Sequence, residues 1–423
     1  MKRLFGNIGW LLGGRGVNAV LSLVYLALAT RTLGIESFGH FAIIIALGQT
    51  VTGLASFQTW QFVVRWGSGG DGLARATGFA VALDILSAVL GAILAAVLVW
   101  SAQFWLPLPT DLLPVAFGYC IVSLFAIRMT PLGLLRLNFE YKRATLAEAI
   151  QPIVRALGAV LAWLTMPTVL GFVLAWAAAE VAVALALWVA AATHERIDLS
   201  RVSLTSLPRE EAGAWRFVLS TNMTGSLAVG GKQVLLLLVG AIGGEAFAGG
   251  FRVASQLGTA LVSLAQTVSK AIYPELVHAQ TAAHDIARRM ANIALIAGVL
   301  AVFVAVAFGR EGLTLIAGPE FDRFYWTMVI LAIAGAIELV GASLESLLVS
   351  ANKAHTAFVV RAVPTILSLA FLQTAMDWNG LKGAAFTVLG ASALAVIGFW
   401  VAIISLQQIT ITVDPKKQDK ARP

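Results

Sequence analysis

The chain has 423 residues, of which 59% are apolar and only 12% are charged. A soluble domain carries about 25% charged residues, so this composition indicates a polytopic membrane protein. In a membrane protein, a net charge of +7 usually comes from basic cytoplasmic loops, so it does not indicate nucleic acid binding. A single cysteine, Cys120, and histidines without ligand spacing predict neither a disulfide framework nor a metal site. No motif predicts a cofactor or a catalytic centre.

Twelve apolar segments are long enough to cross a membrane, which requires about 20 helical residues. In chain order they are 8–30, 40–63, 76–100, 111–135, 144–165, 168–193, 212–240, 247–270, 290–309, 324–350, 354–376 and 381–406. The sequence therefore predicts an all-α polytopic protein of twelve transmembrane helices. Because the longest polar segment follows the sixth of them, we expect four regions. These are an N-terminal six-helix lobe (1–193), a cytoplasmic linker (194–211), a C-terminal six-helix lobe (212–406) and a cytoplasmic tail (407–423).

The first two apolar segments enclose a polar turn, residues 30–40, and together predict a transmembrane hairpin. A similar turn, residues 242–249, lies between the seventh and eighth segments. Four positions match without a gap: Leu33, Gly34, Glu36 and Phe38 align with Ile242, Gly243, Glu245 and Phe247. A spaced repeat of a membrane hairpin indicates two related lobes with a substrate between them.

The distribution of Lys and Arg predicts the orientation in the membrane. When the N-terminus is placed inside, most of these residues outside the spans fall on the cytoplasmic side. The outer side then holds only Arg31, Arg310, Arg323 and Lys382. By the positive-inside rule, we expect both termini to be cytoplasmic. The outer loops are all short, which argues against an extramembrane catalytic domain and hence against an enzyme.

Residues 29–39, Ala-Thr-Arg-Thr-Leu-Gly-Ile-Glu-Ser-Phe-Gly, resemble the N-terminal signature of the Wzx-like polysaccharide-transporter branch of the multidrug/oligosaccharidyl-lipid/polysaccharide (MOP) exporter superfamily. Later segments agree with it: 133–140, 251–254, 273–274 and 318–321. The resemblance implies two six-helix lobes that form a V around a central cavity opening alternately to the two sides. It also implies a flippase in the bacterial inner membrane. Its substrate would be a polyprenyl-diphosphate-linked oligosaccharide for O-antigen, capsule or exopolysaccharide, with a polysaccharide polymerase as a further partner.

Five cations lie within the predicted spans: Arg15, Arg128, Arg155, Lys232 and Arg252. A charge at the middle of a membrane helix costs about 2.5–3.5 kcal/mol, so it usually faces a cavity or a partner. We predict that these cations bind the diphosphate, because a guanidinium presents a planar fork to phosphate oxygens. Two neighbouring polar residues are predicted to line the same cavity. Asn18 shares a helical face with Arg15, and Gln256 begins a polar stripe after Arg252 that continues through Thr259, Ser263, Gln266 and Lys270.

Two other interpretations of the cations remain open. Their long side chains could reach the headgroups, or they could pair internally, Arg128 with Asp84 and Arg155 with Glu148 or Glu180. Carboxylates within spans are candidate carriers of a coupling H⁺ or Na⁺: Asp84, Glu180, Glu338 and Glu345. An ion-coupled multidrug exporter of the same superfamily is the alternative function. A membrane glycosyltransferase or ligase is the alternative from another class.

Overall fold

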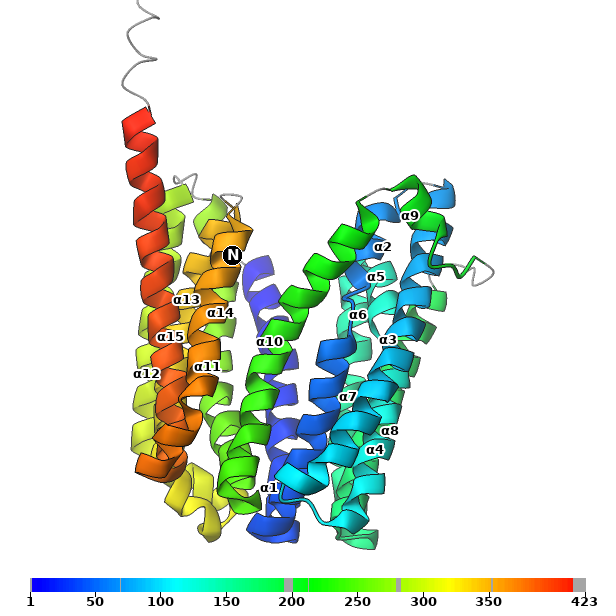
Figure 1. Ribbon diagram of the computed structural model, residues 1–423. Coiled ribbons are helices and arrows are strands. Elements are labelled where there is room, and N and C mark those ends of the chain that lie inside the picture. Colours follow the sequence, from blue (N-terminus) through cyan, green and yellow to red (C-terminus); the bar gives the residue numbers. More distant parts are fainter. Residues whose placement is uncertain are drawn as a thin grey trace, which may run out of the picture. The chain divides into compact units, whose positions relative to one another are not determined.

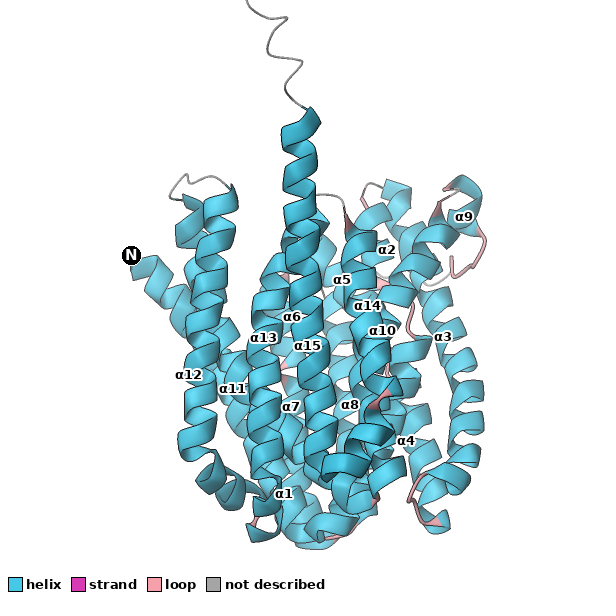
Figure 2. Ribbon diagram, turned by 60° about the vertical axis from the view of Figure 1, so that its left-hand side comes forward, coloured by secondary structure: helices cyan, strands magenta, loops and turns pink. Residues whose placement is uncertain are grey.

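The structure is a computed structural model, shown in Figure 1. It describes the backbone of residues 2–68, 70–193, 201–211, 213–278, 283–350 and 353–413. Within these ranges, side chains are not described before residue 18, from residue 263 to residue 291 or from residue 406 onward, nor at several positions between, among them most of residues 220–230. The described residues form helices joined by short loops, and no strand occurs among them (Figure 2).

The helices follow the order expected from the apolar segments. Their bounds are α1 (Lys2–Ala55), α2 (Trp60–Trp66), α3 (Gly70–Trp105), η1 (Thr110–Leu112), α4 (Leu113–Phe125), α5 (Met129–Leu137), α6 (Tyr141–Glu148), α7 (Ile150–Thr165), α8 (Val169–Ala192), α9 (Ser206–Glu210), α10 (Ala214–Gly243), α11 (Glu245–His278), α12 (Ala283–Ala317), η2 (Pro319–Phe324), α13 (Tyr325–Ser350), α14 (Ala354–Ala370) and α15 (Leu372–Val413). Eight described stretches are long and apolar enough to cross a membrane, and one of them, Val20–Trp66, contains the second predicted segment and the end of the first. The protein therefore has the predicted all-α, multi-pass membrane fold, and a twelve-helix arrangement fits it.

Contacts within the chain divide it into two compact units. One comprises Gly14–Arg252 and Ile316–Glu320, and is called the 14–252 unit below. The other comprises Met1–Gly13, Val253–Leu315 and Phe321–Pro423, and is called the 253–423 unit. In the 14–252 unit, α3 contacts α4, α4 contacts α8, and α8 contacts α7 (Figure 1). In the 253–423 unit, α13, α14 and α15 contact one another. The division into two six-helix lobes, 1–193 and 212–406, stays a prediction.

The hairpin turn predicted at residues 30–40 lies within α1, at Gly34. Its φ of 70° and ψ of 177° interrupt the helix, and glycine adopts a positive φ without a Cβ clash. The same conformation recurs at Gly244, with φ 85° and ψ 177°, where α10 ends. The structural equivalent of Gly34 is therefore one residue later than Gly243, the match made from the sequence. The sequence match followed side chains, whereas the turn is defined by a backbone conformation that either adjacent glycine could supply.

The two turns approach each other closely within the 14–252 unit. A Cβ added at Gly39 would overlap the carbonyl oxygen of Glu245, and one added at Gly249 would lie 3.0 Å from the carbonyl oxygen of Ile35. The two contacts are reciprocal, since Ile35 and Glu245 directly follow the two positive-φ glycines. The close approach of the two backbones therefore requires glycine at position 39 and leaves little room for a side chain at position 249.

Three of the predicted spans are broken rather than continuous. The second is interrupted between α1 and α2, where Gln58 has a φ of 54°. The fourth is interrupted between α4 and α5, and the fifth is divided at Ala149 between α6 and α7, although Ala149 itself keeps helical dihedrals. Irregular backbone at membrane depth is tolerated only where it is buried in protein or lines a water-filled cavity. The breaks therefore mark where a polar site is expected.

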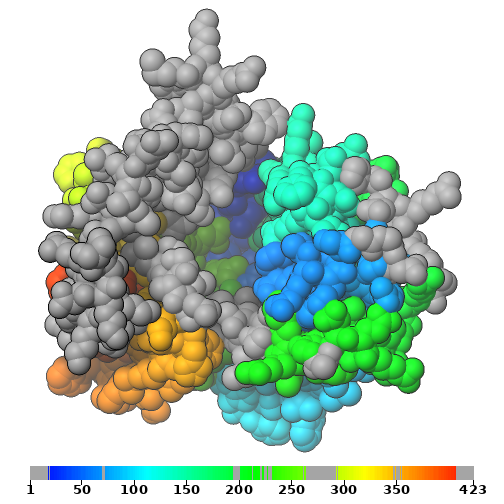
Figure 3. Space-filling view, turned by 90° about the horizontal axis from the view of Figure 1, so that it is seen from above, coloured from blue at the N-terminus to red at the C-terminus, as the bar shows by residue number. Residues whose placement is uncertain are grey.

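The described part of the predicted linker lies against the helices of the 14–252 unit. Glu210 of α9 forms an ion pair with Arg75 of α3, and Leu207 is buried in a cluster with Phe62 and Phe79. Phe217, at the start of α10, lies edge-to-face with Phe62, their ring centroids 5.3 Å apart. Figure 3 shows the green linker and α10 residues beside the blue residues that precede them in the unit. The start of α10 is thus fixed to α2 and α3.

Candidate functional site

A cavity of about 440 Å³ lies within the 14–252 unit, beside two of the helix breaks. Its lining is unusually polar for a membrane interior. The side chains and backbone that line it belong to Gly48, Gln49, Thr52, Gly53, Ser56, Gln58, Asp84, Ser87, Tyr119, Ser123, Ala126, Ile127, Arg128, Met129, Gln151, Arg155, Glu180 and Gln233. These residues come from α1, α3, α4, α5, α7, α8 and α10 and from the breaks after α1 and α4.

The backbone groups freed by the breaks are bound by side chains of neighbouring helices. Asn222 of α10 donates its amide to the carbonyl of Ser56 at 2.8 Å. Trp188 of α8 donates its indole N–H to the carbonyl of Ile127 at 3.0 Å. An unpaired carbonyl in a low-dielectric interior costs free energy comparable to a lost hydrogen bond. The breaks are therefore held by defined contacts rather than left as frayed helix ends.

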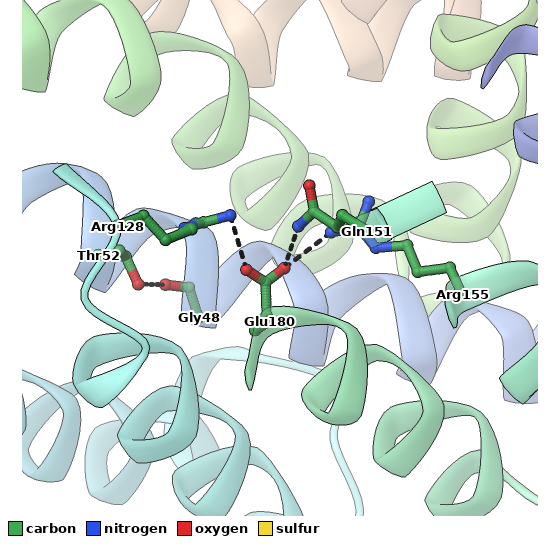
Figure 4. Close-up of polar contacts among 6 residues, drawn as sticks. All are labelled: Gly48, Thr52, Arg128, Gln151, Arg155 and Glu180. Carbon is green, nitrogen blue, oxygen red and sulfur yellow. Dashed lines mark hydrogen bonds and ion pairs between the residues drawn. The ribbon is translucent and has the colours of Figure 1, made fainter. Parts of the chain in front are cut away.

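The polar centre of the cavity is the carboxylate of Glu180, on α8. Arg155 of α7 places Nη2 2.7 Å from Oε1, and Gln151 donates Nε2–H to the same oxygen at 2.9 Å. Arg128, in the break before α5, places Nη1 2.9 Å from Oε2. Figure 4 shows Arg128 reaching Glu180 from one side and Gln151 and Arg155 from the other. One carboxylate therefore holds two guanidinium groups.

The members of this cluster differ in exposure. The side chain of Glu180 is 5% exposed, that of Arg155 16% and that of Arg128 28%. Arg155 also lies over the ring of Trp176, with its guanidinium carbon 5.3 Å from the centroid, and a cation over an indole face is electrostatically favourable. Trp176 is in turn enclosed by edge-to-face contacts with Tyr25 and Phe41. Arg155 is thus the buried, fixed partner, and Arg128 is the partner on the cavity side.

A third cation, Arg252 of α11, lies near this cluster. It is partly buried, and Arg155, Tyr25 and Tyr119 lie close enough to act on it electrostatically. Among the described side chains, no ion pair with a carboxylate is found for Arg252. Arg155 and Arg252 repel each other, so an anion between them would lower the electrostatic energy of the site.

Asp84, the other carboxylate of the cavity lining, accepts hydrogen bonds from residues next to the helix breaks. Thr59, which precedes α2, donates its hydroxyl to Oδ1 at 2.8 Å, and Thr130, in the first turn of α5, donates to Oδ2 at 2.5 Å. All three residues are buried. Arg128 pairs with Glu180, not with Asp84 as one interpretation of the sequence had it. Asp84 therefore joins the starts of two helices that continue after the breaks.

Replacing Asp84 with alanine is expected to destabilise the protein. Each threonine hydroxyl left buried without a partner costs about 1–3 kcal/mol, so we expect a loss of about 2 kcal/mol or more in the free energy of unfolding. Asp84→Asn keeps an acceptor and adds a donor, and should retain most of the stability. The measurement is the thermal unfolding midpoint of the purified protein in detergent. A midpoint for Asp84→Ala equal to that of the wild type would contradict the joining role.

Among the described residues, none of the other predicted site residues lines the cavity. The side chain of Arg15 is outside the described residues, as are those of Ser263, Gln266 and Lys270. Asn18 and Gln256 are partly buried on α1 and α11. Lys232 is exposed on α10 and does not line the cavity, whereas its neighbour Gln233 does. Glu148, the other predicted partner of Arg155, is exposed.

Glu338 and Glu345 share one face of α13, as their spacing predicts, because both contact Arg361 of α14. Arg361 Nη2 lies 2.6 Å from Glu345 Oε2, and Nη1 lies 3.8 Å from Glu338 Oε1. This cluster belongs to the 253–423 unit. Two carboxylates here face one guanidinium, the reverse of the arrangement around Glu180.

Several lining residues were not predicted from the sequence. Gln49, Thr52 and Ser56 follow the helical spacing of one face in the second span, which is the signal that would have found them. The side-chain oxygens of Gln49 and Gln233 are buried and have no hydrogen-bond partner among the described atoms. Buried amide oxygens without partners are rare, so they are candidates to accept hydrogen bonds from a ligand or from water.

No family model matches the chain. The inner membrane protein YghQ of Escherichia coli (strain K12) is 27% identical over 337 residues, which cover 77% of this chain and 95% of that protein. Among solved structures, an inward-facing multidrug resistance MATE family transporter of the MOP superfamily is similar with a TM-score of 0.70 and 16% identity, over 93% of this chain and 96% of that one. The lipid II flippase MurJ, in an inward closed conformation, is similar with a TM-score of 0.71 and 12% identity, over 93% of this chain and 87% of that one.

These similarities concern the fold. At 12–16% identity and TM-scores near 0.7, the chain shares the fold of this MATE structure, which is of the MOP superfamily, and the fold of MurJ. The multidrug transporter DinF-BH, solved in complex with R6G, is a further structure of this kind, with a TM-score of 0.63 over 96% of each chain. The Wzx-like branch implied by the sequence is not singled out by these structures.

Proposed function

We propose that the protein is a flippase that moves polyprenyl-diphosphate-linked oligosaccharides from the cytoplasmic to the periplasmic leaflet by alternating access. The observation that carries the proposal is the pair of arginines at Glu180, which lines a polar cavity within a transporter fold. Arginines are kept inside a membrane at a cost, and a cavity that holds them is suited to an anionic ligand. The guanidinium fork matches the oxygens of a diphosphate.

The neutral part of the lining supports the same substrate class. Gln49, Gln58, Gln151 and Gln233 present amides to the cavity, and serine and threonine hydroxyls lie between them. Amides and hydroxyls both donate and accept hydrogen bonds, as sugar hydroxyls require. A cationic centre beside an amide-rich wall therefore suits a glycosyl diphosphate better than an apolar cation.

The proposal includes the setting of the protein. It places the chain in the bacterial inner membrane with both termini in the cytoplasm, since the positive-inside rule favours this orientation. It also includes the two six-helix lobes, 1–193 and 212–406, and glycans of the O-antigen, capsule or exopolysaccharide kind. A periplasm-active reporter fused after Pro423 should be silent, and activity there would contradict the orientation.

The function is tested by deleting the gene in the source organism. We expect the deletion strain to lose a surface polysaccharide and to accumulate its polyprenyl-diphosphate-linked repeat unit. Wild-type protein and the Arg310→Ala variant, which changes an exposed ion pair, should both restore export. Arg155→Ala should not, even where a blot shows normal abundance. Unchanged surface polysaccharides in the deletion strain would overturn the proposal.

One observation favours a second candidate, an ion-coupled multidrug exporter. Carboxylates suit cationic drugs, and Asp84 and Glu180 both line the cavity. Against this, each carboxylate is already bound by its own donors: two threonines at Asp84, and two arginines and a glutamine at Glu180. Efflux of a cationic dye that requires Glu180 would favour this candidate over the flippase.

A further inference from the structure

The two oxygens of the Glu180 carboxylate are held unequally. Oε1 accepts hydrogen bonds from Arg155 at 2.7 Å and from Gln151 at 2.9 Å. Oε2 lies 2.9 Å from Arg128 Nη1, yet it accepts no hydrogen bond among the described atoms, because the approach of Arg128 lacks hydrogen-bond geometry. Charge-assisted hydrogen bonds depend on alignment as well as distance. The contact with Arg128 is therefore the weaker side of the cluster.

Arg128 is also the member with room to move. It lies in the break between α4 and α5, with φ −122° and ψ −26°, and its side chain is more exposed than that of Arg155. The backbone beside it is anchored, since Trp188 binds the carbonyl of Ile127. The side chain can thus turn toward the cavity while the chain and Glu180 stay in place. Arg155, stacked on Trp176, has no such freedom.

We propose that Glu180 competes with incoming anions for Arg128. As a result of this competition, the cavity admits dianionic diphosphates and excludes the monoanionic phosphodiester headgroups of bulk lipids. In the empty site Glu180 holds Arg128, and a diphosphate draws Arg128 away while Arg155 and Gln151 keep the carboxylate in position. The inference rests on the proposed function, of which it specifies the selectivity. Free and lipid-linked diphosphates share the chemistry that the site would recognise, a phosphate anion.

The selectivity follows from competition within the site. A carboxylate fixed beside Arg128 acts as an intramolecular ligand, so an incoming anion must exceed its attraction to take the arginine. Coulomb attraction scales with ligand charge, which gives a dianion about twice the attraction of a monoanion at equal distance. A membrane offers monoanionic phosphodiesters in large excess. A site with a free arginine pair would therefore be occupied by bulk lipid.

The experiment measures binding of three probes to the full-length protein in nanodiscs of neutral lipid. The probes are inorganic pyrophosphate, farnesyl diphosphate and phosphatidylglycerol, which separate a free diphosphate from a lipid-linked diphosphate and from a monoanionic lipid phosphodiester. For the wild type, we expect both diphosphates to bind and to raise the melting temperature, and phosphatidylglycerol to have no effect. Arg128→Gln should weaken diphosphate binding about tenfold or more, as expected for the loss of a charge-assisted contact.

Glu180→Gln gives the decisive result. Without the competitor, we expect it to bind phosphatidylglycerol, so that the preference for diphosphate over monoanion falls about tenfold or more. Its melting temperature should be low without ligand and should rise further with pyrophosphate than that of the wild type. Glu180→Asp keeps the charge but draws it back from Arg128, so it is expected to show an intermediate preference and to fold if Glu180→Gln does not.

An unchanged preference in both Glu180 variants would overturn the inference and leave a structural ion pair. This outcome is separable from failure of the proposed function. If the preference shifts but the deletion strain exports all its glycans, the selectivity stands and the cargo is another diphosphate. If export fails in the deletion strain while the preference does not shift, the flippase stands and Glu180 is not its selector.

Discussion

Replacing Gly39 with alanine is expected to force apart the two hairpin turns. The new methyl group would overlap the backbone of Glu245, which cannot move as a flexible side chain could. Overpacking of this kind typically costs about 1–3 kcal/mol, and a clash with backbone lies at the upper end. The thermal unfolding midpoint of the purified protein should fall accordingly, and transport should fall with it.

Gly118 supplies the matched control for this experiment. It lies within α4, and a Cβ added there meets no atom within 4 Å. Alanine favours a helix over glycine, so Gly118→Ala should leave stability unchanged or raise it slightly. Equal midpoints for Gly39→Ala and Gly118→Ala would show that the turns are not in close backbone contact.

Replacing Arg155 with alanine is expected to destabilise the protein strongly. The change removes the buried partner of Glu180 at 2.7 Å together with the contact over Trp176. Breaking a buried ion pair on one side typically costs about 3–5 kcal/mol, because a charge is left uncompensated. Arg128 remains at Oε2 and should reduce this loss. Unfolding by heat or denaturant in detergent measures it.

The exposed pair of Arg310 and Asp322 tests whether burial is the cause. Its two nitrogen–oxygen contacts, 2.8 and 2.7 Å, are as short as those of Arg155, but the Arg310 side chain is 66% exposed. Surface ion pairs contribute about 0–1 kcal/mol, so Arg310→Ala should have little effect. Similar losses for Arg155→Ala and Arg310→Ala would contradict the assigned burial of the Glu180 cluster.

Two of the helix breaks could have been predicted from prolines in the sequence. They were missed because both prolines lie inside long apolar segments. Pro131 lies in the first turn of α5 and Pro152 in that of α7, where proline is tolerated because the backbone N–H groups have no partner within the helix. The break after α1 has no such signal, since residues 56–59 contain neither glycine nor proline. It is held by tertiary contacts, from Asn222 to Ser56 and from Thr59 to Asp84. Contacts between distant residues are not visible in local sequence.

The candidate site likewise depends on contacts between distant residues that the local sequence does not show. Charges inside apolar spans pointed to Arg128, Arg155, Asp84 and Glu180, and all four line one cavity. Their pairing could not be read from spacing. Glu148 and Arg155 are seven residues apart, a spacing that places them on one helical face, yet Glu148 is exposed while Arg155 pairs with the buried Glu180. The partner of Arg155 comes instead from the next span.

The docking of the linker on α2 and α3 has a consequence for how the chain is made. A nascent chain that has left the ribosome only as far as residue 193 lacks Leu207 and Phe217, which cover Phe62 and Phe79. Asn222, which binds the carbonyl of the broken second span, is also missing at that stage. The helices up to α8 therefore cannot complete their tertiary structure while the chain after residue 193 is still missing. Synthesis of α9 and α10 supplies the missing contacts, so a segment made late completes the packing of helices made much earlier.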